Sequence, residues 1–290
     1  MPLALPVQAV LLAAFLLPAL AAGPSLAVAA AAEALQATAS PAARQNAIQS
    51  LPMEKLNQAA RAKVSAVLSN VTVFRRLPIR MIGCDPDLYL FLVRHPDVLI
   101  NIWEVLGISQ IQIRQIGPDN YRIVEGEGTS ASMEILYRAE DTHLVYGQWS
   151  YSGTLLPKPI RGRCLAMLKS GFVREADGRS YVSSRLDAFL SVEPGGAELL
   201  TKTLHPLVIK NADANFIQTL AFAGSLSRTA EVNTRGMLRL AGRLSHVAPE
   251  TREQFGEVVS VVADRWASLL AQRPDEATQM AGRVDAPPRR

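Results

Sequence analysis

The stretch from Tyr181 to Val192 limits what this chain can fold into more than any other, because apolar and polar side chains alternate along most of it. Such alternation is typical of a β-strand with one face in the core. The Asp177-Gly178 step before it favours a hairpin turn, so an antiparallel partner strand is expected just upstream. Pro194-Gly195-Gly196 ends the strand. An apolar stripe with helical spacing then predicts one long helix from 197 to 231, with a kink at Pro206.

The sequence upstream of this hairpin predicts a run of strands with helices on either side. Strands are expected at 111–116, 121–125, 131–138, 143–151 and 163–174, separated by turn signals such as Gly117-Pro118-Asp119-Asn120. A strand at 71–82 contains Pro78, which favours the edge of a sheet. Helices are expected at 53–68 and at 86–106, the second broken at His95-Pro96. Residues 232–250 allow another helix, and 251–272 keep a helical apolar period.

Taken in order, residues 71–230 give one strand, two short helices, a run of antiparallel strands and one long helix. In this order the sequence resembles the START-like, polyketide-cyclase superfamily of helix-grip proteins. The resemblance rests on the segments 178–192 and 194–231 and on the order of elements. It implies an α+β fold, in which a bent antiparallel sheet of about seven strands wraps around a long C-terminal helix.

The resemblance also implies a cavity between the sheet and the long helix, and members of the superfamily bind lipids, sterols or other hydrophobic molecules there. The alternation assigns inward-facing residues that would bind such a ligand: Met133, Ile135, Tyr137, Trp149, Leu168, Leu186 and Leu190, facing Phe216 and Leu220. The same residues would alternate identically if the interior were a filled core, so the sequence does not distinguish a cavity from a filled core.

Three functions remain open. The first is a module that binds a hydrophobic small molecule or lipid without a catalytic step. The second is a cyclase or dehydratase type of enzyme, which requires at least two of His143, Glu134, Arg185 and Asp187 to converge inside the cavity. The alternation, however, places Glu134 opposite Met133 and hence outward. The third is an interaction or structural protein of the cell envelope that uses the 251–272 helix and the tail to bind a partner.

Familiar catalytic and metal motifs are not found in the sequence. The four histidines lack metal-like spacing, no serine sits in a Gly-x-Ser-x-Gly elbow, and no cofactor is expected. His95-Pro96-Asp97 spells the tripeptide of the J-domain co-chaperones, but it is embedded in apolar sequence, and we interpret it as a chance match. The net charge of +4 comes from mixed charges spread along the chain, which does not favour nucleic-acid binding.

The N-terminus predicts export from the cytoplasm. Residues 1–31 carry no charged side chain and combine an apolar core with small residues after Pro18, which is typical of a signal peptide. An uncleaved anchor is the alternative, and it would hold the domain near a membrane. The expected order is then a spacer at 32–50, the START-like domain at 51–231, C-terminal helices at 232–273 and a disordered tail at 274–290. The protein is expected in the periplasm or outside the cell.

The two cysteines, Cys84 and Cys164, would meet an oxidising compartment after export, so a disulfide between them is one interpretation. Two buried free thiols are the other. In a helix-grip arrangement the first strand pairs with the last, and this places Cys164 one strand away from the neighbour of Cys84. Direct bonding is therefore doubtful.

Overall fold

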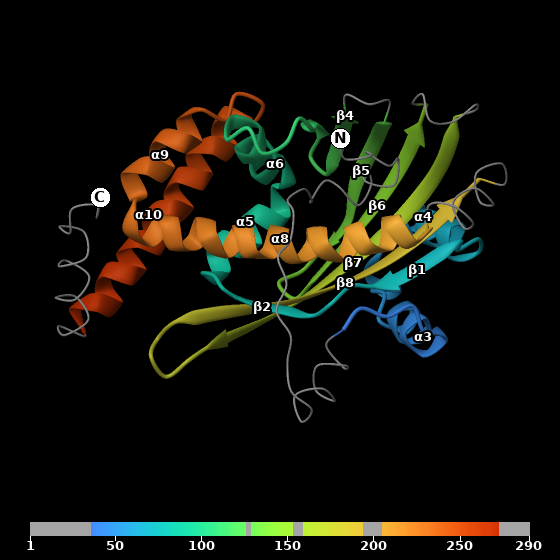
Figure 1. The fold of residues 1–290 in the computed structure, drawn as a ribbon, viewed down its shortest axis with the longest axis horizontal. Coiled ribbons are helices and arrows are strands. Elements are labelled where there is room, and N and C mark those ends of the chain that lie inside the picture. The colour runs from blue at the N-terminus through green and yellow to red at the C-terminus, as the bar shows by residue number, and fades with distance from the viewer. Residues whose placement is uncertain (1–35, 126–128, 153–158, 194–204, 273–290) are drawn as a thin grey trace.

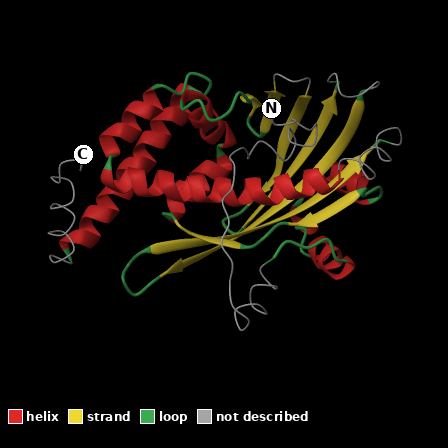
Figure 2. Ribbon diagram, viewed as in Figure 1, coloured by secondary structure: helices red, strands yellow, loops and turns green. Residues whose placement is uncertain are grey.

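A computed structural model describes residues 36–125, 129–152, 159–193 and 205–272 of the 290-residue chain. The fold is α+β, with an open antiparallel sheet and a long C-terminal helix lying across it (Figures 1 and 2). The strands are β1 (Val73–Arg76), β2 (Arg80–Gly83), β3 (Gln112–Gly117), β4 (Asn120–Glu125), β5 (Thr129–Arg138), β6 (Thr142–Tyr151), β7 (Ile160–Arg174) and β8 (Ser180–Val192). The helices are α3 (Pro41–Gln49), the 3-10 turn η1 (Met53–Lys55), α4 (Gln58–Leu68), α5 (Pro86–Arg94), α6 (Pro96–Val105), α8 (His205–Val232), α9 (Thr234–Gly242) and α10 (Pro249–Ala271).

The sheet order is β1-β8-β7-β6-β5-β4-β3, and β2 also pairs with β8. The predicted strand at 71–82 is therefore two short strands, which both lie along β8 and are separated by a break around Pro78. Proline has no backbone N–H to donate and interrupts a strand at such a point. The first and last strands pair, as a helix-grip fold requires, and the topology fits that fold.

Helices cover both faces of the sheet. On one face, α5, α6 and α8 pack with the sheet around the larger hydrophobic cluster, α8 crosses the strands, and α9 and α10 extend this cluster by packing on α5 and α8 (Figure 1). We call this the concave face. On the opposite face, α3 and α4 enclose a second cluster with Leu144, Leu165, Met167 and Phe189, each 0% exposed. Along most of the strands, successive residues belong alternately to the two clusters, as the alternation in the sequence predicts.

The segment predicted as a spacer at 32–50 is corrected by the structure. Residues 41–49 form α3, whose first turn is capped by the Ser40 side chain. Thr38 pairs with Arg76 of β1 through two backbone hydrogen bonds of 2.8 and 2.9 Å, and Asn46 accepts a hydrogen bond from the Arg76 guanidinium. The segment is polar and rich in alanine, so its own pattern is weak. Its order comes from contacts with a strand some thirty positions later in the chain.

The C-terminal helices belong to the same core. Helix α9 forms within the region that the sequence left ambiguous, and α10 matches the helix expected at 251–272. Phe255, Val259 and Val262 of α10 are at most 2% exposed and pack in the concave-side cluster. In the part of the chain that the structure describes, no helix is long and apolar enough to span a membrane. The predicted leader and tail lie outside the described residues.

The hairpin between β7 and β8 reaches α10 at Gly178. This glycine has a φ of +80°, and a Cβ there would lie 2.6 Å from a methyl carbon of Leu269. We expect Gly178→Ala to lower the free energy of unfolding by about 1–2 kcal/mol, because an L-residue is strained in this conformation. Urea denaturation measures the change.

Gly107→Ala is the matched control, since Gly107 has a φ of +70° but a Cβ there would have no atom within 4 Å. Equal losses in the two variants show strain alone, whereas a larger loss at Gly178 shows that the hairpin packs against α10. A Gly178→Ala variant as stable as the parent contradicts the prediction.

Candidate functional site

The concave face collects eight of the nine residues that the sequence assigns to a ligand site. Met133, Ile135, Trp149, Leu168, Leu186, Leu190, Phe216 and Leu220 all belong to the concave-side cluster. Tyr137 is the exception, because it packs in the cluster on the opposite face. The register of β5 against β6 shifts between Ile135 and Tyr137, and the extra residue, Leu136, forms a bulge. One added residue reverses the faces of the strand beyond it, so the prediction for Tyr137 was wrong.

At one position on each of the strands β5 to β8, the concave face carries an apolar side chain that is only partly buried. Met133, Val145, Leu168 and Leu186 lie on the four neighbouring strands β5 to β8, and each is only partly buried. We call these four residues the concave patch. On the opposite face, Leu144 of β6, Leu165 and Met167 of β7 and Phe189 of β8 have no exposed surface. These four positions are therefore solidly packed, whereas the concave patch keeps accessible apolar surface.

Four polar side chains lie beside the concave patch at the junction of α5 and α6. His143 is next to Leu168 in the register of β6 and β7, and Tyr121 is next to Met133 in the register of β4 and β5. His95 and Asp97 belong to the junction itself. We call His95, Asp97, Tyr121 and His143 the corner cluster. Each has at least one buried polar side-chain atom with no hydrogen-bond partner.

Burial shifts the ionisation of the corner cluster toward neutral side chains. It lowers the pKa of His143 to about 4, with the nearby charges of Arg94 and Arg138 acting in the same direction. Burial also raises the pKa of Tyr121 to about 12 and raises the pKa of Asp97 above its ordinary value. Asp97 is only 1% exposed and His95 and Pro96 are partly buried, so the His95-Pro96-Asp97 sequence is not an exposed docking loop here.

The acid–base arrangement that the enzyme hypothesis requires is not formed. Of the four residues it names, His143 lies on the concave side. Glu134 pairs with Lys63 of α4 on the opposite face, as the alternation predicts. Arg185 and Asp187 also lie on that opposite face, together with Phe189, and Asp187 pairs with Arg76. Two inward and convergent groups were required, so this version of the hypothesis is wrong. Among the described residues, no group of three or more His, Cys, Asp or Glu side chains is placed to hold a metal ion.

The cysteines are free and buried, so the disulfide interpretation was wrong. Cys84 lies between β2 and α5, with its sulfur 3.8 Å from the carbonyl oxygen of Ala223 on α8. Cys164 lies on β7 opposite Leu190 of β8. Burial raises the pKa of each thiol to about 12, so both remain protonated and unreactive.

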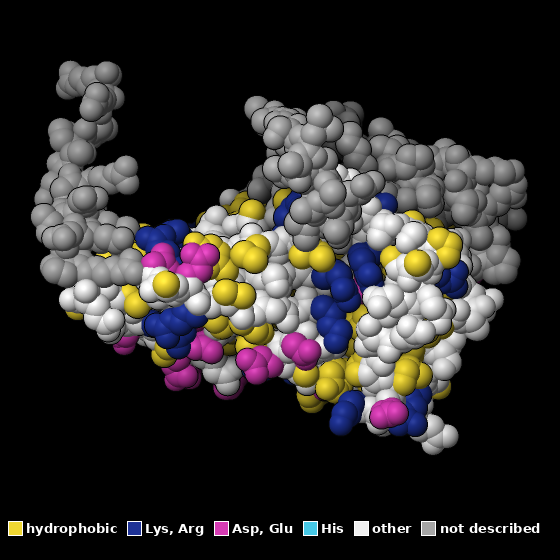
Figure 3. Space-filling view, turned by 90° about the horizontal axis from the view of Figure 1, so that it is seen from below, with side chains coloured by type: hydrophobic (Ala, Val, Ile, Leu, Met, Phe, Trp, Pro, Cys, Tyr) yellow, Lys and Arg dark blue, Asp and Glu magenta, His cyan; other side chains and the backbone are white. Residues whose placement is uncertain are grey.

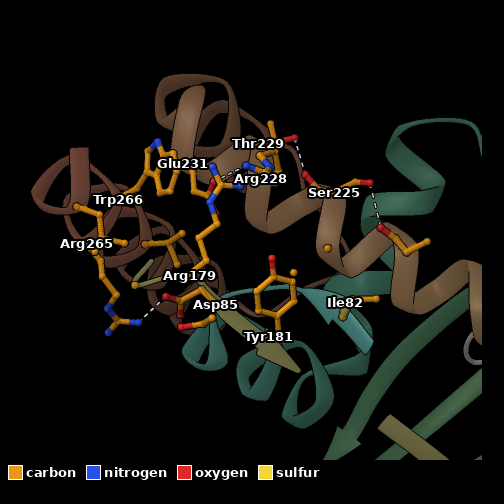
Figure 4. A pocket seen from close by; sticks show the side chains of 17 residues that line it. Ile82, Asp85, Arg179, Tyr181, Ser225, Arg228, Thr229, Glu231, Arg265 and Trp266 are labelled. Carbon is orange, nitrogen blue, oxygen red and sulfur yellow. Dashed lines mark hydrogen bonds and ion pairs between the residues drawn. The ribbon is translucent and has the colours of Figure 1, made fainter. Parts of the chain in front are cut away.

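A separate pocket of about 580 Å³ lies between the β7–β8 hairpin, α8 and α10. We call it the hairpin pocket. In Figure 4, Arg179 extends across it from the hairpin, toward Arg228 and Glu231 of α8, while the Tyr181 ring points from β8 toward α8. Trp266 and Arg265 line the side formed by α10. On the face shown in Figure 3, basic and acidic side chains lie next to one another.

The sequence analysis did not identify the hairpin pocket, because its residues come from four segments that are distant in the sequence. Arg179, Arg228 and Arg265 belong to the hairpin, α8 and α10 respectively. The one local signal was the Asp-Gly turn, which predicts the hairpin but not what its tip contacts. The hairpin carries the neighbour of that turn, Arg179, to 5.2 Å from the centre of the Trp266 ring.

No protein-family model matches the chain, and no curated protein matches its sequence. Solved structures share parts of the architecture. A conserved protein from Geobacillus kaustophilus is 12% identical over 51% of this chain and 93% of its own, with a TM-score of 0.36. An uncharacterized protein from Rhizobium leguminosarum is 13% identical over 50% and 95%, with a TM-score of 0.29. Ara h 8.0201 is 14% identical over 50% and 99%, with a TM-score of 0.25. Likeness at this level carries no argument about function, which must come from the residues of this chain.

Proposed function

We propose that this chain is an exported START-like module that binds a hydrophobic small molecule or lipid between the concave face and α8, without a catalytic step. The observation that carries the proposal is the contrast between the two faces of strands β6 and β7. Leu144, Leu165 and Met167 are 0% exposed on the α4 side, whereas the concave patch on the other face remains partly exposed. Ligand pockets are mostly apolar with a few polar groups, and the concave patch beside the corner cluster has that composition.

The corner cluster supports a ligand with one neutral polar end. Buried polar atoms without partners cost free energy, on the order of 1–3 kcal/mol each, so several in one place require an explanation. His143 and Tyr121 are uncharged at neutral pH and offer donors and acceptors to a hydroxyl or carbonyl group. The arginines near His143 disfavour a cationic end. An apolar body on the concave patch and a neutral polar end at the corner cluster describe one amphiphile.

Direct binding tests the proposal. The full chain is expressed with export, purified, extracted with organic solvent and analysed by mass spectrometry, and it is then titrated with dansylated lipids. We expect a co-purifying apolar molecule and saturable binding of at least one lipid. Absence of both results would overturn the proposal. N-terminal sequencing of the exported protein separates a cleaved leader from an anchor.

A matched pair of substitutions on β7 tests whether the space beneath α8 is real. Leu168 lies on the concave patch, and Leu165 lies on the same strand beneath α4, fully buried. We expect Leu168→Phe to change the free energy of unfolding by less than about 1 kcal/mol, because accessible space receives the larger side chain. Leu165→Phe should cost about 1–3 kcal/mol, since the site beneath α4 has no space for it. Chemical denaturation measures both changes.

The same pair connects stability with binding. Leu168→Phe should reduce lipid affinity about tenfold or more, because its ring occupies the volume assigned to the ligand. Leu165→Phe, once folded, should bind as the parent does. If both variants lose similar stability and neither changes binding, the concave face is a filled core and the proposed function fails.

A further inference from the structure

Two of the three arginines of the hairpin pocket, Arg179 and Arg228, differ from the third, Arg265, and from Arg76. Arg76 donates two hydrogen bonds of 2.6 and 3.0 Å to Asp187, and Arg265 joins Asp85 and Asp87, the latter at 2.7 Å. Arg179 and Arg228 instead lie 3.6 Å from their nearest carboxylates, Asp177 and Glu231. This distance exceeds that of a hydrogen bond.

The guanidinium N–H groups of Arg179 and Arg228 are therefore available to a ligand. Among the residues that the structure describes, neither guanidinium donates a hydrogen bond to a protein oxygen. Each guanidinium has five N–H donors in a planar fork, which matches the oxygens of a phosphate or carboxylate. Both side chains enter the same pocket, from the hairpin and from α8 (Figure 4).

The rest of the pocket holds these arginines in position. Arg179 stacks over Trp266, which is 8% exposed, and this contact orders a side chain that would otherwise be mobile. The α8 residues Gly224 and Arg228 are one helical turn apart and so share a face. At Gly224 the helix lies so near β2 that a Cβ would approach the carbonyl oxygen of Gly83 to 3.2 Å. The floor of the pocket is thus backbone and fixed aromatic surface.

We propose that the hairpin pocket binds a small organic oxyanion, whose oxygens pair with Arg179 and Arg228 and whose body lies against Tyr181 and Ile82. The pocket volume of about 580 Å³ falls in the range of small-molecule sites. No residue of the concave patch lines the pocket, so the inference does not depend on the hydrophobic ligand proposed above. The oxyanion comes either from a soluble molecule or from the headgroup of an anionic lipid.

Phenyl phosphate is the soluble probe, titrated into the full chain by calorimetry at low and at physiological salt. We expect Arg228→Ala to weaken binding about ten- to a hundredfold, because a charge-assisted paired contact is lost. Arg228→Lys keeps the charge without the fork and should fall between the parent and Arg228→Ala. Arg235→Ala, an exposed arginine on α9 outside the pocket, is the matched control and should bind as the parent does.

A substitution at Glu231 tests whether the hairpin pocket binds an anion or a cation. It lies beside Arg228, and one of its carboxylate oxygens is buried without a hydrogen bond. Glu231→Gln removes a negative charge next to the proposed anion, so phenyl phosphate should bind about two- to fivefold more tightly. A site for a cation requires the opposite, with weaker binding in Glu231→Gln and stronger binding in Arg228→Ala, and that pattern would overturn the proposal.

Vesicles separate the two sources of the oxyanion. Phosphatidic acid vesicles are compared with phosphatidylcholine vesicles in sedimentation assays. Binding of phenyl phosphate that is lost in Arg228→Ala supports a soluble ligand. Binding to phosphatidic acid vesicles alone, lost in the same variant, supports a lipid headgroup. No binding to either probe at millimolar phosphate, or equal binding in Arg228→Ala, refutes the site. The Arg228 side chain is 53% exposed, so we expect Arg228→Ala to fold, and thermal unfolding of the variant checks this.

Discussion

Replacement of Asp187 by alanine is expected to lower the free energy of unfolding by about 3 kcal/mol, because it leaves a charged partner unpaired in the interior. Asp187 is 0% exposed and accepts hydrogen bonds of 2.6 and 3.0 Å from Arg76. Arg185 lies 3.5 Å from the same carboxylate. The Arg76 side chain is only 15% exposed and also bonds Asn46 of α3. Loss of the carboxylate therefore also weakens the attachment of α3.

Two further variants show that the effect comes from burial. Asp119→Ala breaks the 2.8 Å ion pair between Asp119, whose side chain is 47% exposed, and Arg138, whose side chain is 33% exposed. This change should lower the free energy of unfolding by less than about 1 kcal/mol. Arg76→Met combined with Asp187→Ala should recover part of the loss, since no unpaired Arg76 remains. Denaturant titrations of the parent, Asp187→Ala, Arg76→Met and the double variant give the coupling between Arg76 and Asp187. A cost at Asp187 no larger than that at Asp119 contradicts the prediction.

The sequence predicted the strands and most of their faces because the signal there is local. Alternation from 181 to 192 assigns Leu186 and Leu190 to one side from their spacing alone, and the structure places both in the concave-side cluster. A bulge has no such signal. The extra residue at Leu136 is visible only in the pairing with β6, and for that reason the prediction for Tyr137 failed while that for Ile135 held.

Features that join distant segments could not be predicted from spacing. Helix α3 depends on Arg76, and Arg76 depends on Asp187, which lies 111 positions further along the chain. The same holds for the hairpin pocket, where a turn residue meets two helices. Sequence patterns report burial along one element, but which charged side chains pair is decided by how the elements pack. For this reason Asp187 was considered for catalysis and proved to be a structural partner.

Acidification should destabilise the protein through His143, by about 3 kcal/mol between pH 7 and pH 4. His143 is 2% exposed, and burial lowers the pKa of its ring to about 4 in the folded protein, against an ordinary value of 6.5. Between these two values the unfolded chain binds a proton that the folded chain does not. Stability attributed to His143 is therefore present above pH 6.5 and is lost as the pH falls toward 4.

The difference between the parent and His143→Leu isolates this contribution from other groups. Arg94, Arg138 and Asp141 act on the ring and remain in both proteins. Burial lowers the pKa of His95, which destabilises in the same direction, and raises the pKa of Asp97, which acts in the opposite direction. Both contributions cancel when the stability of one protein is subtracted from that of the other at each pH.

At pH 7, His143→Leu should be at least as stable as the parent, because two ring nitrogens without hydrogen-bond partners leave the core. As the pH falls from 6.5 to 4, the variant should gain on the parent by about 1.4 kcal/mol per pH unit. Leu168→Met, a change at the neighbouring apolar position, is the control and should follow the slope of the parent. Parallel curves for the parent and His143→Leu from pH 7 to 4, measured by urea denaturation, would show that His143 is not held neutral by the fold. Since the proposed ligand end depends on a neutral ring at this position, that result would also remove His143 from the ligand site.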